Sequence, residues 1–303
     1  MSLQFIVDGL LIGGLIGLGA IGVTLTYSIL RFANFAHGEL VSWGAYFAFA
    51  VSAALGLASG SMTVPLAPFS FGWSLPIATL AAIVLTAGLA LVVDAVLFGP
   101  LRARRSTVII LVMASFGAAL TLRSLLEFIF TSQPAYFTKE LQIAIRLGAG
   151  LRATPDQLLT LGLAASVVVG VHLMLTRTAI GRSMRAVSEN PQLSGVVGID
   201  VRAVVRTVWV LGAGLACIAG VMAGLLVQIR PQMGLDLLLP LFAAAILGGI
   251  GSVPGAMLAG LIVGVAEALA VQLIGAEWRA SIAFVILILI LILRPQGLFG
   301  RAE

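Results

Sequence analysis

Long runs without a charged residue dominate this sequence and limit what it can fold into. They cover residues 9–30, 157–176, 207–229 and 237–266, and the interval 40–93 also lacks charge. A bilayer core about 30 Å thick requires roughly 20 apolar residues in a helix, and these runs reach that length. Hydrophobic residues make up 60% of the chain and charged residues 10%, which leaves too little polar surface for a water-soluble globule. The sequence therefore predicts an all-α, polytopic helix bundle in a membrane.

Breaks within the runs set the number of spans. A Gly, Ser and Pro cluster at residues 56–76 divides the interval 40–93 into two helices, and residues 106–130 form another span. The run 237–266 is too long for one helix and breaks at residues 248–255, around Pro254. It should give a short or re-entrant segment, 237–250, and then a full span that ends near Ile274. With a shorter span at 280–293, we expect eight crossings, or nine if segment 237–250 also crosses.

The basic residues predict an orientation. If the loops near 31–38, 99–105 and 177–206 and the tail after residue 293 share one side, that side holds eleven arginines, and the other side holds five basic residues. Cytoplasmic loops carry the excess of Lys and Arg, so the first side is expected to be cytoplasmic. The N-terminus would then lie outside and the C-terminus inside, which favours nine spans. We expect one transmembrane domain over residues 1–303, with a cytoplasmic loop at 177–206 and an external loop at 131–154.

The cytoplasmic loop is unusually polar for such a chain. Within it, Ala179 to Ser188 is expected to form a short helix that ends at Asn190-Pro191. Its charged residues Arg182, Arg185 and Glu189 are spaced by three and four positions, which places them on one helix face. Two interpretations remain open: the loop docks a soluble partner, or it is a solvated loop whose arginines only set the topology.

Several catalytic classes are excluded by what the sequence lacks. The only lysine is Lys139, outside any glycine-rich loop, so the chain has no phosphate-binding P-loop of its own. His37 and His172 are far apart, and Cys217 is the only cysteine, so we expect no metal site, no disulfide and no catalytic residues. The basic residues have no aromatic residues among them, so nucleic-acid binding is not expected despite a pI of about 10.3.

Charged residues inside the apolar runs are few. Arg123 and Glu127 are four positions apart and are expected to pair with each other on one helix. Asp94 and Glu267 fall near the ends of their spans. A carrier coupled to protons or sodium usually has such a group at mid-membrane, and this pattern does not provide one.

Glycines at four-residue spacing favour close helix packing. They occur at Gly9, Gly13 and Gly17, at Gly220 and Gly224, and at Gly260 and Gly264. Small faces of this kind let helices approach in lipid, where hydrophobic burial does not drive association. Packing within the chain is the favoured interpretation, and a contact between subunits is the alternative.

Four ordered motifs, which together extend over nearly the entire chain, resemble one known family. They are Arg31-Phe-Ala-Asn-Phe-Ala-His-Gly-Glu39 with Trp43-Gly-Ala-Tyr46; Gly181-Arg-Ser-Met-Arg-Ala186 with Glu189-Asn-Pro191 and Gly198-Ile199; Leu247-Gly-Gly-Ile-Gly-Ser-Val-Pro-Gly-Ala256; and Arg294-Pro-Gln-Gly-Leu-Phe-Gly300. In this form and order they resemble the LivH-type permease subunit of the branched-chain amino acid ABC importers.

The resemblance implies a multi-subunit importer in a bacterial inner membrane. Its parts are two permease subunits, the second a LivM-type paralogue or another copy, two cytoplasmic ATPases that bind ATP-Mg, and a periplasmic substrate-binding protein. This chain would bind no cofactor itself. The residues implied to couple it to the ATPases are Gly181, Arg182, Arg185, Ala186, Glu189 and Asn190. After Pro191 the family commonly has two alanines and a basic residue, whereas this chain has Gln192 to Gly195, so individual ATPase contacts do not transfer.

Two further sets of residues are candidates for function. Asn34, His37, Gly38 and Glu39 either cap the helix ends at a break or line the inner mouth of the solute path. Lys139, Glu140, Arg146 and Arg152, in the external loop, are expected to meet the binding protein.

The resemblance leaves the solute open. Branched-chain or other hydrophobic amino acids are favoured, and urea, amides or aromatic acids are the alternatives within the family. A sugar importer of the broader superfamily fits the Asn34 to Glu39 motif less well. A self-sufficient carrier or channel, and lastly a membrane enzyme, are the remaining classes.

Overall fold

A computed structural model describes residues 4–138, 142–148, 151–294 and 296–299 of the chain. Seven of its helical segments are long and apolar enough to cross a membrane. They are α1 (Gln4–Leu30), α2 (Ala36–Ala58), the continuous segment Ser74–Ala103, α5 (Val108–Phe130), α6 (Pro155–Arg177), α9 (Val201–Leu226) and α11 (Val253–Ile274). Two apolar helices are shorter, α10 (Met233–Gly248) and α12 (Arg279–Leu293). The chain is therefore an all-α integral membrane protein.

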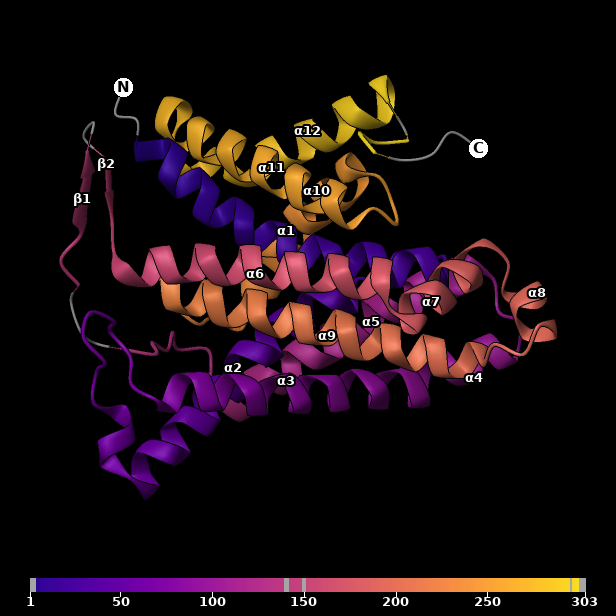
Figure 1. Cartoon of the computed structure of the whole chain (residues 1–303), viewed down its shortest axis with the longest axis horizontal. Helices are drawn as coiled ribbons and strands as arrows, with labels where there is room; N and C mark the ends of the chain where they lie inside the picture. Colours follow the sequence, from indigo (N-terminus) through magenta and orange to yellow (C-terminus); the bar gives the residue numbers. More distant parts are fainter. Residues whose placement is uncertain (1–3, 139–141, 149–150, 295, 300–303) are drawn as a thin grey trace.

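The smaller elements lie at the two ends of the bundle (Figure 1). At the left of that view are two antiparallel strands, β1 (Ile145–Gly148) and β2 (Leu151–Ala153). At the right are the short helices α7 (Ala179–Glu189) and α8 (Pro191–Val196). We call these the hairpin end and the α7 end. The chain enters at the hairpin end, where the Gln4 side chain donates to the Arg152 carbonyl at 2.8 Å.

The segment Ser74–Ala103 is not a uniform helix. It consists of α3 (Ser74–Val93), a π-helical stretch (Asp94–Phe98) and α4 (Gly99–Ala103). The sequence patterns predicted neither this π-helical stretch nor the strand pair. Within the π-helical stretch, Asp94 forms an ion pair with Arg102, with 2.7 Å between Oδ1 and Nη2.

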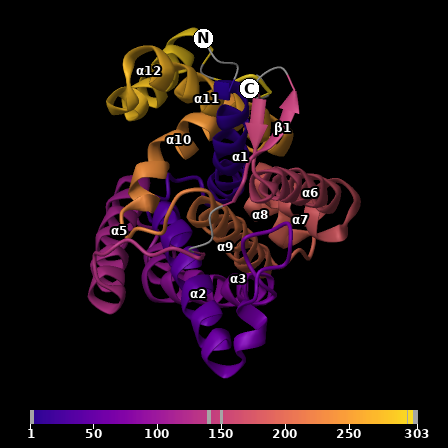
Figure 2. The ribbon, with the colours of Figure 1, turned by 90° about the vertical axis from the view of Figure 1, so that its left-hand side faces the viewer.

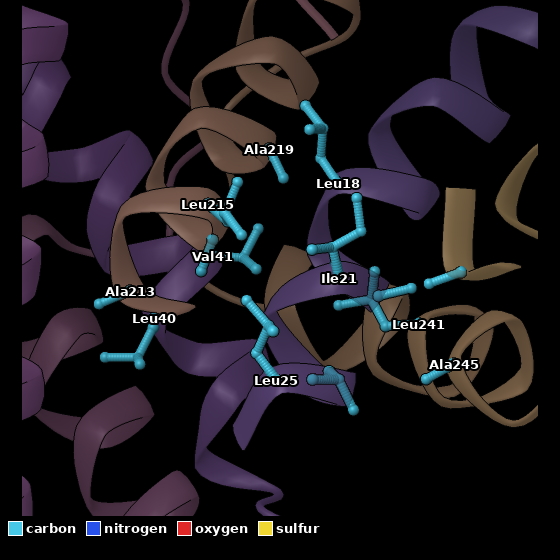
Figure 3. Close-up of a cluster of buried hydrophobic side chains, with 14 of the residues drawn as sticks. Leu18, Ile21, Leu25, Leu40, Val41, Ala213, Leu215, Ala219, Leu241 and Ala245 are labelled. Carbon is cyan, nitrogen blue, oxygen red and sulfur yellow. The ribbon is translucent and has the colours of Figure 1, made fainter. Parts of the chain in front are cut away.

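Helix α1 lies at the centre and packs on α9, α10 and α11 (Figure 2). A cluster of buried side chains connects α1 to α2, α9 and α10 (Figure 3). The labelled members are Leu18, Ile21 and Leu25 from α1, Leu40 and Val41 from α2, Ala213, Leu215 and Ala219 from α9, and Leu241 and Ala245 from α10. All are buried, so their packing holds the four helices together.

The glycine faces pack inside the chain, as the favoured interpretation predicted. A Cβ atom on Gly13 would lie 2.7 Å from the Cα of Leu261 on α11, so only glycine allows this approach. The same holds between α2 and α9, where a Cβ on Gly44 would lie 2.5 Å from the Cα of Cys217. Cys217 is fully buried at this contact.

The helices follow the predicted runs and breaks; seven are long enough to span a membrane, and whether the shorter α10 and α12 also cross stays a prediction. Helix α2 ends at Ala58 and α3 begins at Ser74, and the run 237–266 divides between α10 and α11 at residues 249–252. Helix α10 has 16 residues and is about 24 Å long, shorter than a bilayer core of about 30 Å. Its first residues lie against α2, its middle against Gly19 of α1, and Thr24 of α1 accepts from the Gly251 amide just after its end.

Candidate functional site

Helix α7 leaves the end of α6 by a sharp turn at Thr178. The Thr178 amide donates to Met174 at 3.2 Å and so ends α6, and its hydroxyl accepts from the Gly181 amide at 3.2 Å and so begins α7. A side chain on Gly181 would collide with the backbone of Leu175, so glycine permits the turn. The predicted helix at 179–188 is present and extends to Glu189.

Two opposite faces of α7 differ in chemistry. Met184 and Val187 are buried against the bundle, whereas Arg182, Arg185 and Glu189 are exposed. The Arg185 guanidinium also donates to a carbonyl of α6, that of Leu175. The charged residues singled out from the sequence therefore lie on the face of α7 that a soluble partner could reach.

A third segment fixes the end of α7 from the opposite side. Arg31, between α1 and α2, donates from Nη2 to the carbonyls of Ser188 at 3.0 Å and Glu189 at 3.1 Å. Its backbone has a positive φ of 56°, which few non-glycine residues adopt. Arg31 thus connects the α1–α2 turn to α7.

Asn190 and Asp200 serve as helix caps. The Asn190 side chain accepts from the Leu193 amide at 3.0 Å and begins α8. Asp200 accepts from the Arg202 amide at 2.9 Å and from the Ala203 amide at 3.1 Å, and so begins α9. Both polar residues are thereby used to shape the loop.

Exposed apolar side chains accompany the charges at this end. On and just after α8, Leu193 is 59% exposed, Val196 84% and Val197 68%. We call Arg182, Arg185, Leu193, Val196 and Val197 the α7–α8 surface. Sequence reasoning missed its apolar part, although an apolar triplet inside a charged loop was a signal. Leu193 and its neighbours fall where the chain departs from the family pattern.

The residues Asn34 to Glu39 form the start of α2. The Asn34 side chain accepts from the Ala36 amide at 3.2 Å, and the Phe35 amide donates to Ser115 of α5, also at 3.2 Å. His37 is fully buried against Gly22 of α1. Gly38 lies against the carbonyl of Gly234, where a side chain would not fit.

The expected pairing of Arg123 with Glu127 is wrong. Arg123 instead binds Glu39, with 2.5 Å between Nη2 and Oε1 and 3.2 Å between Nε and the same oxygen. The second oxygen of Glu39 is buried and has no hydrogen-bond partner within the described part of the chain. The pair forms because α2 begins inside the bundle and so brings Glu39 next to α5.

Two other carboxylates in the spans are paired. Asp94 binds Arg102, as noted above, and Glu267 accepts from Arg279 Nε at 3.0 Å. Glu267 is 1% exposed, and it lies with Gln4 and Asp8 in a pocket at the hairpin end. Glu267 and Arg279 are twelve positions apart, and this spacing did not identify them as partners in the sequence.

At the hairpin end, Asp156 organises the external segment. Its carboxylate accepts from the Ser70 amide at 3.2 Å, from the Ser70 hydroxyl and from Gln142 Nε2 at 2.9 Å. Arg146 and Arg152 are paired across the two strands, and both side chains are exposed. Lys139 and Glu140, the other residues expected to meet the binding protein, lie outside the described residues.

Comparison with known proteins places the chain in a family. Residues 5–292 match the family described as the branched-chain amino acid transport system permease component. The chain belongs to this permease family. The permease protein BraD of the high-affinity branched-chain amino acid transport system of Pseudomonas aeruginosa is 33% identical, over 99% of this chain and 96% of that protein. The corresponding permease LivH of Escherichia coli is 31% identical, over 99% of this chain and 96% of that protein.

PsaBC from Streptococcus pneumoniae in complex with Fab matches with a TM-score of 0.48 and 13% identity, over 97% of this chain and 93% of that chain.

Proposed function

We propose that this chain is a permease subunit of an ABC importer that carries branched-chain or other hydrophobic amino acids. Its relatives BraD and LivH are named as permeases for branched-chain amino acids, which supports this solute class. A periplasmic binding protein would deliver the solute, and two separate ATPases with ATP-Mg would supply the energy. Alternate opening of a path between this chain and a second, LivM-type permease would move the solute across the bacterial inner membrane.

The α7 end would face the cytoplasm and the hairpin end the periplasm. Exposed arginines support this orientation, because cytoplasmic ends carry the excess of positive charge. Arg31 bonds to the end of α7, Arg177 ends α6, Arg182 and Arg185 lie on α7, Arg202 and Arg206 lie in the first turns of α9, and Arg104 and Arg105 follow α4. Figure 1 shows these parts of the helices at the α7 end. Helix α1 begins at the hairpin end, so the N-terminus would be periplasmic. The C-terminus would be cytoplasmic, as the distribution of the arginines along the sequence predicts. Residues 1–303 would act as one transmembrane domain, with 177–206 as its coupling loop and 131–154 as its external loop.

The α7–α8 surface is the observation that carries this proposal. Exposed apolar side chains beside charged ones are typical of a protein interface. Because α7 is fixed both to α6 and to Arg31, a force on this surface would be passed to the α1–α2 turn. An ATPase seated here could therefore move the helices of the path.

Two substitutions on the α7–α8 surface test the proposal. Val196→Asp and Arg182→Glu change exposed side chains, so the fold should persist. Each should reduce co-purification of tagged ATPases by tenfold or more, together with ATP-dependent leucine uptake. Arg146→Glu, a matched charge reversal at the hairpin end, should leave co-purification unchanged. Normal assembly and uptake in both α7–α8 variants, or uphill uptake by the purified chain alone, would contradict the proposal.

The paired strand arginines are proposed as part of the docking site for the binding protein. Like charges directly opposite each other on two strands are unfavourable, so an acidic partner would relieve Arg146 and Arg152. Arg146→Glu should lower stimulation of ATP hydrolysis by the binding protein while ATPase assembly persists. Calorimetry of that binding protein with leucine, urea and an aromatic acid would identify the solute.

A further inference from the structure

One face of the bundle, beside α5 and the start of α10, carries exposed charges that would be costly in contact with lipid. Figure 2 shows α5 and α10 on the same side, with α2 next to both. Just before and within the first turn of α10, Arg230 and Asp236 form a loose ion pair at 3.5 Å, and their side chains are 48% and 55% exposed. Placing a charge in hydrocarbon costs at least about 2.5–3.5 kcal/mol. This face should therefore meet water or solute.

These charges lie at the depth of the Arg123–Glu39 pair. Trp43 of α2 donates from Nε1 to the Leu122 carbonyl of α5 at 3.1 Å. This bond places Trp43 at about the same depth in the bundle as Leu122. Its neighbour Ser42 donates to the Pro231 carbonyl at 3.1 Å and accepts from the Gly234 amide at 2.9 Å. The start of α10 is therefore level with Leu122, which is eight residues, or about 12 Å, from the end of α5.

We call Glu39, Arg123, Arg230 and Asp236 the charged belt. It has two positive and two negative side chains from three parts of the chain. The second oxygen of Glu39 is buried without a partner among the described residues, so a solute would reach it only when α2 and α5 move apart. The Arg230–Asp236 pair is exposed enough for either group to bind something else. An amino acid presents one carboxylate and one ammonium, and such a belt can bind both by charge-assisted hydrogen bonds.

An aromatic cluster lies below the belt, towards the α7 end. Phe35 contacts Phe116 of α5 edge-on, with ring centroids 6.2 Å apart, and Phe242 of α10, with centroids 5.5 Å apart. It thus bridges the two helices at the start of α2. Phe116 precedes Arg123 by seven residues, so it lies on nearly the same face of α5 and about 10 Å closer to the α7 end.

We propose that this face is the wall of the amino-acid path. The charged belt binds the ammonium and carboxylate of the solute, and the aromatic cluster closes the path on the cytoplasmic side of the belt. The second permease would supply the opposite wall. This inference rests on the importer function proposed above, and the experiments below are read in a complex whose ATP-dependent uptake has first been measured. Loss of that uptake in the unsubstituted complex would refute the importer function, whereas the results below address only the path.

Thiol labelling tests whether this face of the bundle is accessible to water. The only native cysteine, Cys217, is fully buried, so the unsubstituted protein should react little with the reagent. Leu120→Cys lies on α5 between Phe116 and Arg123 and is 47% exposed, whereas Val84→Cys on α3 is 71% exposed among apolar residues. In the assembled importer, a membrane-impermeant thiol reagent should label Leu120→Cys at least tenfold faster than Val84→Cys. This difference is expected in at least one of two states, nucleotide-free or ATP-trapped. Equal rates at the two positions in both states would overturn the assignment.

Truncation of one ring tests the closure. Phe116 is 52% exposed, so Phe116→Ala removes little buried packing. In proteoliposomes without ATP, the Phe116→Ala importer should release trapped leucine at least fivefold faster than the unsubstituted one. Phe128→Ala is the matched control, because this ring is 86% exposed on a different side of α5. A Phe116→Ala complex that still binds its ATPases and leaks no faster than the control would refute the closure.

Discussion

Arg123 of α5 donates two hydrogen bonds to one oxygen of Glu39 in the first turn of α2, from Nη2 at 2.5 Å and from Nε at 3.2 Å. The side chains are 16% and 2% exposed. The pair connects α5, which is otherwise largely exposed, to the buried start of α2. A charge here is stabilised only while its partner is present, because burial without a partner is costly.

Removing one member of this pair should destabilise the permease strongly. We expect Arg123→Ala to lower the free energy of unfolding by about 3–5 kcal/mol, because Glu39 would keep an unpaired buried charge. The double change Glu39→Gln with Arg123→Gln should cost less, since no charge remains. Thermal unfolding in detergent measures both. Glu127→Ala is the control, and an effect of Glu127→Ala as large as that of Arg123→Ala would show that the wrong partner has been assigned.

The sequence could not reveal this pairing. Spacing by four residues indicated Glu127 as the partner of Arg123, because that rule uses only neighbours on one helix. Glu39 is 84 positions away and meets Arg123 only because α2 begins inside the bundle. The sequence did show that Glu39 opens an otherwise uncharged helix and so needs a partner, but it did not show which residue that partner is.

Helix contact through glycine gives a second prediction. Gly13→Val should destabilise the protein by about 1–3 kcal/mol, because the added side chain would meet the backbone of Leu261 and separate α1 from α11. Gly170→Val in α6 is the matched control, since a Cβ there meets nothing within 4 Å. Both variants introduce the same helix propensity cost, so the difference in melting temperature isolates packing. Equal melting temperatures would contradict it.

The spans were predictable because one physical cause determines them. Apolar length and the position of Gly and Pro clusters located α2, α3, α5 and α11 and the break before Val253. The start of α10 at Met233 was missed by four residues, since the predicted segment followed the charge-free run, which begins only after Asp236. The strand pair depends on long-range packing, which periodicity does not report.

The Arg31 contact predicts a defect in coupling. Arg31→Ala removes the hydrogen bonds to the carbonyls of Ser188 and Glu189 and leaves the α7–α8 surface itself unchanged. ATPases should still co-purify, while leucine transported per ATP hydrolysed should fall several-fold. Arg104→Ala, another exposed arginine near that end, is the control and should keep the wild-type ratio. An unchanged ratio in Arg31→Ala would mean that the α1–α2 turn does not receive motion from α7.

Asp156 predicts the behaviour of the external segment. Asp156→Ala removes the acceptor for Ser70 and Gln142, so the segment around residue 142 should open more often. Hydrogen bonds to a charged group contribute about 1.5–3 kcal/mol each, and 1.4 kcal/mol changes an opening equilibrium about tenfold. Limited proteolysis of right-side-out vesicles should therefore cut residues 131–154 at least tenfold faster. Asp156→Asn keeps an acceptor oxygen, so its cleavage rate should lie between those of the wild type and Asp156→Ala. The ATPases should co-purify with all three proteins. Cleavage at the wild-type rate in Asp156→Ala would show that the hairpin end is held by other contacts.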